Sequence, residues 1–161
     1  MKAVILVGGE GMRLKPLTLG TPKPAVPVAN RPFLAHVIAM LGRAGVDGVV
    51  LATGYLPDVL QGRLRQGGDH GVQITYSVEE APLGTAGAVK LAEAHIDETF
   101  AVLNGDIFSD LDLRAMIDFH RSRGAAATIA LTWVADPSAF GVVEADDDGH
   151  VSRFVEKPPP G

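Results

Sequence analysis

Short apolar runs alternate with longer amphipathic segments along this chain. Five runs predict β-strands, at residues 3–7, 48–53, 72–78, 100–103 and 126–134. The first, second and fourth runs are continuous, which is typical of strands buried on both faces of a parallel sheet. Trp133 lies near the end of the fifth run and is expected in the core. Segments 141–144 and 151–155 flank Asp148-Gly149, and this arrangement predicts a hairpin.

Apolar residues at helical spacing predict four helices between these strands. The first follows Asn30-Arg31-Pro32 and ends at Gly45, and the others cover residues 57–66, 85–95 and 112–123. Asn30 is a suitable N-cap for the first helix, and Asp110 or Asp112 for the last. This alternation predicts an α/β fold, a Rossmann-like, doubly wound, mostly parallel sheet with helices on both faces.

Composition narrows the class of protein. The 161 residues are 47% hydrophobic and 20% charged, which suits one soluble globular domain. The net charge of −5 argues against nucleic acid as a partner, because duplex-binding domains usually carry a basic surface. The chain has no cysteine, so disulfides and Cys-ligated metal centres are excluded. No apolar run approaches the roughly 20 residues that span a bilayer. We expect a cytoplasmic protein without a membrane partner.

Loops of unusual composition follow three of the predicted strands. They contain Gly8-Gly9, Glu79-Glu80 and Asn104-Gly105-Asp106. Ligands of an open α/β sheet bind beyond the carboxyl ends of its strands. We therefore expect these three loops to converge at one edge of the sheet.

The first loop has the sequence GGEGMRLKPLT over residues 8–18. Its glycines let backbone N–H groups approach a phosphate, and Arg13 would add a fork of donors. A plain tight turn is the alternative. Further along, two prolines bracket Lys23 and would hold it on a stiff loop over the same strand end.

Asp106 directly follows a predicted buried strand. A carboxylate there is well placed for Mg²⁺, which prefers one or two carboxylates together with substrate phosphates. An Asx turn is the alternative. Lys157, at the end of the last strand, would neutralise a second phosphate or lie on the surface as an ordinary lysine.

The motifs GGEGMRLKPLT, PKP, EEAPLGTAGA, NGD, FGVV and EKP follow one another between residue 1 and about residue 158. Together they resemble the sugar-phosphate nucleotidylyltransferase family, whose fold is of the nucleotide-diphospho-sugar transferase type. EEAPLGTAGA and VANRPF resemble the branch that joins GTP and mannose 1-phosphate. The resemblance implies in-line attack of a sugar 1-phosphate on the α-phosphorus of an NTP, with release of pyrophosphate and with Mg²⁺ as cofactor.

The resemblance also implies roles for the matching residues. The catalytic group is Arg13 at the departing phosphates, Lys23 near the α-phosphate and Asp106 on the metal. The nucleotide-binding group is Gly8, Gly9, Gly11, Glu79, Gly84 and Thr85. The sugar-phosphate group is Asn104, Gly141, Glu156 and Lys157. Met12 and Phe140 depart from the family pattern, which often has Thr and Tyr there.

Base choice is argued from hydrogen-bonding chemistry. Guanine presents N1–H and N2–H₂ donors that an ionised carboxylate accepts together, whereas Gln suits uracil or thymine. Glu79 therefore favours GTP; in the alternative, Glu79 faces solvent and Glu80 or backbone groups recognise the base. A glucose-1-phosphate uridylyl- or thymidylyltransferase, a heptose-1-phosphate guanylyltransferase and a non-catalytic nucleotide-sugar-binding subunit stay open as alternatives.

Catalytic domains of this family usually continue well past the E-K-P segment. We therefore expect residues 1–161 to be the N-terminal, nucleotide-binding portion of a nucleotidylyltransferase domain, with the C-terminal acceptor portion missing. Homo-oligomer formation stays an open option.

Overall fold

A computed structural model describes residues 1–9, 11–64 and 71–158. The chain forms two compact units, Met1–Ala115 and Met116–Gly161, which we describe in turn. The expected domain over residues 1–161 stays a prediction. No helix in the described parts of the chain is long and apolar enough to cross a membrane.

The first unit is built on a four-stranded parallel sheet. Its strands are β1 (Lys2–Leu6), β4 (Gly48–Thr53), β5 (Gln73–Val78) and β6 (Ala101–Asn104), in the order β5-β4-β1-β6. Every residue of β4 is buried, as its continuous apolar run predicts. β6 differs from the prediction of a buried strand, since its residues alternate in exposure and Val102 is 47% exposed. The reason is that β6 lies at an edge of this sheet, where β1 is its one partner among the described strands.

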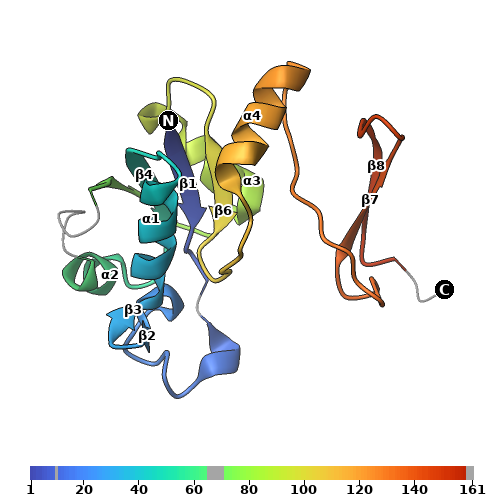
Figure 1. Ribbon diagram of the computed structural model, residues 1–161. Helices are drawn as coiled ribbons and strands as arrows, with labels where there is room; N and C mark the ends of the chain where they lie inside the picture. The colour runs from blue at the N-terminus through green and yellow to red at the C-terminus, as the bar shows by residue number, and fades with distance from the viewer. Residues whose placement is uncertain (10, 65–70, 159–161) are drawn as a thin grey trace. The chain divides into compact units, whose positions relative to one another are not determined.

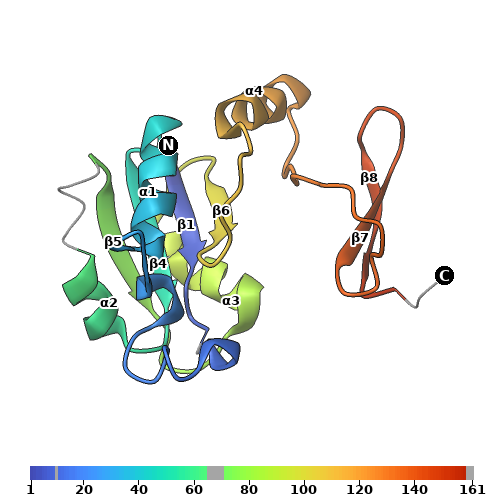
Figure 2. The ribbon, with the colours of Figure 1, turned by 60° about the horizontal axis from the view of Figure 1, so that its bottom comes forward.

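Helices cover both faces of the sheet (Figure 1), which confirms the predicted layers. α1 (Phe33–Arg43) lies on one face and α3 (Gly84–Leu91) on the other, as the turned view in Figure 2 also shows. α1 buries the apolar stripe Leu34, Val37, Ile38 and Leu41. Under α3, Ala88 packs with Val4 and Val50. Small residues on α3 thus bring this helix close to the sheet.

The remaining helices match their predictions in part, and α4 (Leu113–Arg123) spans the boundary between the two units. α2 (Pro57–Arg63) follows β4, and residues 65 and 66 of the predicted helix lie outside the described residues. The predicted helix at 85–95 is α3 followed by the short helix η3 (Ala92–His95). α4 starts as predicted, because the Asp112 carboxylate accepts a hydrogen bond from the Ala115 N–H at 3.0 Å.

Asn30 does not cap α1, so that prediction is wrong. Pro32 occupies the N-cap position, without a side-chain hydrogen bond. Asn30 instead lies in the tight turn between β2 (Pro27–Val28) and β3 (Arg31–Pro32), with a φ of 62°. Asparagine tolerates this left-handed conformation better than most residues do. Asn30 therefore forms the β2–β3 turn and is not available to cap α1.

The second unit contains the predicted hairpin, β7 (Gly141–Ala145) paired with β8 (Val151–Glu156). Gly149 takes a φ of 84° in its turn. The Asp146 carboxylate accepts hydrogen bonds from the N–H groups of Asp148 and His150, at 3.1 and 2.8 Å. The His150 hydrogen bond is the main reason why the pKa of Asp146 lies below its ordinary value.

The fifth predicted strand, residues 126–134, is wrong. No residue of this segment is in a strand, and Ile129 and Leu131 are more than half exposed. Trp133, expected in the core, is fully exposed. A strand exists only where a neighbouring strand accepts and donates its backbone hydrogen bonds. The described structure pairs this segment with no strand, so the apolar pattern alone does not make one.

Candidate functional site

The order of the strands defines where a ligand would bind. From β1 the chain passes to β4 and β5 on one side, and it later returns to β6 on the other side of β1. In open α/β sheets, this reversal opens a crevice beyond the carboxyl ends of the two strands that flank it. Here these strands are β1 and β6, which lead into Gly8-Gly9 and Asn104-Gly105-Asp106.

A cavity of about 460 Å³ occupies this position. Eight of the predicted site residues line it: Gly8, Gly9, Lys23, Glu79, Gly84, Thr85, Asn104 and Asp106. The three loops therefore meet at one edge of the sheet, as the topology predicts. The roles of these residues stay predictions.

The turn after β6 depends on glycine. Gly105 is buried, and its N–H donates to the Leu6 carbonyl at 2.9 Å. A Cβ at this position would overlap the Val7 side chain and lie 3.0 Å from the Leu6 oxygen. Only glycine lets the chain pass this close to β1 and then present Asp106 to the cavity.

Lys23 and Asp106 form an ion pair across the cavity, with Nζ 2.5 Å from Oδ2. Lys23 opens the short helix η2 (Lys23–Ala25), in which Pro24 and Ala25 are buried. The lysine is thus held on an anchored loop, as its flanking prolines predict. The Asp106 carboxylate thus pairs with a lysine that is 83 positions away in the sequence. Both side chains are partly exposed, so each is accessible to a new partner.

The oxygen atoms of Asp106 and Asn104 suit a hard divalent cation whose other ligands come from a substrate. Within the described residues, no group of three or more histidine and carboxylate side chains is arranged to hold a metal. The cavity does offer the Asp106 carboxylate, next to Asn104 in the same turn. Mg²⁺ commonly binds through one or two carboxylates together with substrate phosphates. The site therefore fits Mg²⁺ that arrives with a phosphate ligand, and it does not form a complete metal cage.

Glu79 faces the inside of the site. Its N–H donates to the Thr53 carbonyl at 2.8 Å, and its Oε2 accepts from the Leu83 N–H at 3.0 Å. Its Oε1 lies 3.5 Å from the position of a Cβ added to Gly8. The carboxylate thus lies next to the first loop and is partly buried. Glu80 is more exposed and also lines the cavity.

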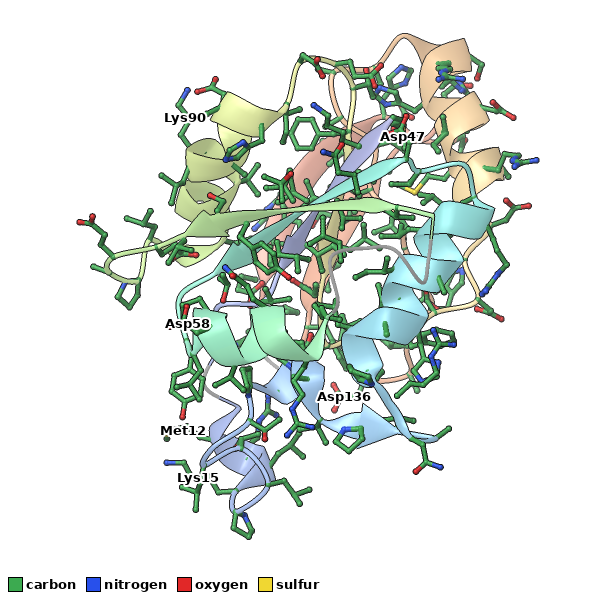
Figure 3. The ribbon with its side chains drawn as sticks, turned by 90° about the vertical axis from the view of Figure 1, so that its left-hand side faces the viewer. Met12, Lys15, Asp47, Asp58, Lys90 and Asp136 are labelled. Carbon is green, nitrogen blue, oxygen red and sulfur yellow. The ribbon has the colours of Figure 1, made fainter. Side chains whose placement is uncertain are left out.

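Gly11 and Arg13 lie outside the cavity lining. Gly11 takes a φ of 63° and precedes the short helix η1 (Met12–Leu14). The side chains of Met12, Arg13 and Lys15 are exposed. Figure 3 shows Met12 and Lys15 on this loop, at a distance from the strands. The backbone of this loop, and not side-chain packing, therefore sets the position of Arg13.

Three predicted residues of the sugar-phosphate group lie in the second unit. Gly141 and Glu156 are partners in the β7–β8 register. A Cβ on Gly141 would lie 2.5 Å from the Phe154 ring, so this glycine makes room for the ring. The Lys157 N–H donates to the Phe140 carbonyl at 2.9 Å. The hairpin thus groups these residues with one another, and their contact with a sugar phosphate stays a prediction.

Sequence reasoning missed two residues next to the site. Thr18 is fully buried, and its carbonyl accepts from the Tyr55 hydroxyl at 3.4 Å. Tyr55 lines the cavity. The sequence did give a signal for Thr18, since a threonine ends the glycine-rich motif. A single tyrosine after β4 belongs to no such pattern.

Comparison with known proteins agrees with this geometry. Residues 2–160 match the model of the family described as nucleotidyl transferase. A mannose-1-phosphate guanyltransferase of Candida albicans is 49% identical over 164 residues, covering 98% of this chain and 45% of the relative. A mannose-1-phosphate guanylyltransferase of Mycobacterium tuberculosis is 45% identical over 156 residues, covering 96% and 44%. The chain thus spans about half the length of these curated relatives.

Solved structures share the fold. A Bacillus anthracis protein, assigned as a glucose-1-phosphate thymidylyltransferase and solved with a sucrose, superposes with a TM-score of 0.86 at 33% identity. That match covers 99% of this chain and 66% of the other. HddC from Yersinia pseudotuberculosis, complexed with GMP-PN, superposes with a TM-score of 0.75 at 31% identity and covers 99% and 71%. The parallel sheet and its flanking helices are therefore those of a sugar-phosphate nucleotidyltransferase.

Proposed function

Since the chain belongs to the nucleotidyl transferase family, we propose that it transfers guanylate from GTP to mannose 1-phosphate, giving GDP-mannose and pyrophosphate. The observation that supports this most is the pairing of Lys23 with Asp106 at the mouth of the β1–β6 crevice. A phosphate that carries a metal ion needs a positive group for its oxygens and a negative group for the metal. Lys23 and Asp106 would supply these two groups. The identities to mannose-1-phosphate guanyltransferases support the choice of substrates.

The chemistry requires two anions to meet without an enzyme nucleophile. An oxygen of mannose 1-phosphate attacks the α-phosphorus of GTP, the bond from that phosphorus to the bridging oxygen breaks, and pyrophosphate leaves. Positioning and charge stabilisation supply most of the catalysis in such transfers. Lys23 would release Asp106 and neutralise the α-phosphate, and Arg13 would hold the departing phosphates.

Proteins of this family generally use a divalent metal, and we propose Mg²⁺ held by Asp106. When bound, Mg²⁺ supplies positive charge that orients the phosphates and stabilises the charge developing on them. The backbone at Gly8, Gly9 and Gly11 would enclose the nucleotide, together with Gly84 and Thr85 at the start of α3. Glu79 would accept the two guanine donors.

The sugar side of the site is proposed from the hairpin and the turn after β6. Glu156 would accept hydrogen bonds from sugar hydroxyls, and Lys157 would pair with the sugar phosphate. Gly141 and Asn104 are the other two residues of the proposed sugar-phosphate group. We also propose a cytoplasmic location, in line with the absence of cysteine.

A panel of substrates tests the proposed function. Pyrophosphate release is measured with GTP, ATP, UTP or dTTP against the 1-phosphates of mannose, glucose and a heptose, in the presence of Mg²⁺. We expect GTP with mannose 1-phosphate to give the highest kcat/KM, at least tenfold above any uridine or thymidine pair. A faster reaction of glucose 1-phosphate with UTP or dTTP would contradict the proposal. Tight nucleotide binding without product from any pair would instead identify a non-catalytic binding subunit.

Glu79→Gln is expected to raise the KM for GTP about 10- to 100-fold and to narrow the preference for GTP over UTP. The amide replaces one acceptor oxygen by a donor that faces the guanine N–H groups, at a cost of about 1–3 kcal/mol. Steady-state kinetics with both nucleotides measures the change. Glu80→Gln is the matched control in the same loop and should stay within twofold of the wild type. The reverse ranking of these two variants would assign base recognition to Glu80.

A further inference from the structure

Thr18 is a buried polar residue in an otherwise exposed loop. Its exposed fraction is 0%, whereas Met12 and Leu17 are each 64% exposed and Leu19 is 65% exposed. The apolar side chains around it therefore do not fix this loop by burial. A fully buried hydroxyl needs a hydrogen-bond partner, and here the partner lies at the start of the same loop.

Hydrogen bonds from Thr18 close the loop that carries Arg13. The Thr18 hydroxyl donates to the Gly11 carbonyl at 3.0 Å. The same carbonyl accepts from the Leu14 N–H at 2.9 Å, which forms the turn of η1. On the other side, the Tyr55 hydroxyl donates to the Thr18 carbonyl at 3.4 Å. One residue thus links η1 to a side chain that lines the cavity.

The packing around Gly11 is equally close. A Cβ on Gly11 would lie 2.9 Å from the Lys23 Cβ and 3.1 Å from the Thr18 methyl carbon. The methyl group of Thr18 therefore fits against Gly11, next to the hydroxyl that holds the Gly11 carbonyl. Valine would keep the shape without the hydrogen bond, and serine would keep the hydrogen bond without the methyl group.

We propose that Thr18 is a positioning residue for Arg13. By fixing the Gly11 carbonyl, it sets the orientation of η1 and hence the direction in which the guanidinium meets the β- and γ-phosphates of the nucleotide. Within the described residues, no hydrogen bond or ion pair is recorded for the Arg13 side chain, so its position depends on this backbone turn. The inference rests on the proposed function, and it assigns a role to a residue that touches neither base nor phosphate.

Comparing GTP with GMP isolates this role, because only GTP has the phosphates that Arg13 would hold. Isothermal titration calorimetry measures both dissociation constants for the protein and its variants. Thr18→Val is expected to weaken GTP binding about 3- to 10-fold, the size of one lost hydrogen bond, and to leave GMP binding within twofold. Thr18→Ser should restore GTP binding to within about twofold of the wild type.

A double-mutant cycle separates positioning from general loss of structure. In an Arg13→Ala background, Thr18→Val should change GTP binding by less than twofold, since the side chain that it positions is gone. If Thr18→Val lowers GTP and GMP binding equally, or acts as strongly without Arg13, Thr18 is only structural and the inference is wrong. Should Thr18→Val fail to fold, Thr18→Ala takes its place in the cycle, with the same expected signature, because it also removes the hydroxyl that binds the Gly11 carbonyl.

The same titration distinguishes this inference from the proposed function. Wild-type protein that binds GTP more tightly than GMP, while the variants lose both equally, would overturn the inference alone. Wild-type protein that binds neither nucleotide would overturn the proposed GTP site and the inference with it.

Discussion

Asp106→Asn is expected to lower the rate of pyrophosphate release about 10²- to 10³-fold, the range for loss of one preorganised electrostatic contact. Asparagine keeps the shape of aspartate but removes the negative charge that would hold Mg²⁺ and that now pairs with Lys23 at 2.5 Å. The measurement is steady-state release with GTP, mannose 1-phosphate and saturating Mg²⁺. Stability should change by less than about 1 kcal/mol, because the ion pair is partly exposed.

Asp110→Asn is the matched control for this experiment. Asp110 follows on the same loop and is exposed, and it does not line the cavity. Both variants lose one negative charge, so a general change in net charge would affect them equally. We expect the control to keep at least half of the wild-type rate. Full turnover by Asp106→Asn at saturating Mg²⁺ would refute the metal-binding role of Asp106.

The sequence predicts the central sheet well because its strands are defined locally. In β1 and β4, a continuous apolar run coincides with burial on both faces, and each run ends at a polar or glycine-rich loop. Residues 126–134 have a similar pattern and form no strand. β1 and β4 each pair with neighbouring strands, whereas the described structure places no strand beside residues 126–134. A strand forms only against another strand. An apolar pattern shows that a segment can form a strand, and a pairing partner decides whether the strand forms.

The positions of the site loops were also predictable, because topology alone brings the carboxyl ends of parallel strands together. The Lys23–Asp106 ion pair was not predictable from spacing, since the two residues are 83 positions apart. Asn30 shows a further limit. The same side chain suits a helix cap and a left-handed turn, and only the short β2–β3 pairing selects the turn.

Gly105→Ala is expected to destabilise the protein by about 1–3 kcal/mol, the usual cost of adding a methyl group to a filled space. The added Cβ would overlap the Val7 side chain and approach the Leu6 carbonyl oxygen to 3.0 Å. β1 and the turn that presents Asp106 would have to separate, so GTP binding should weaken together with stability. Urea unfolding followed by far-UV circular dichroism measures the loss, since the single tryptophan, Trp133, lies in the second unit.

Gly62→Ala is the matched control, because it makes the same chemical change at a helical position in α2 with nothing within 4 Å of the added Cβ. Alanine favours a helix over glycine by about 1 kcal/mol, so this variant should be more stable than the wild type. Opposite signs for the two substitutions would show that the effect at Gly105 comes from the close approach of β1. Equal stability of Gly105→Ala and the wild type would mean that the turn after β6 has room for a side chain. In that case the position of Asp106 would not depend on glycine.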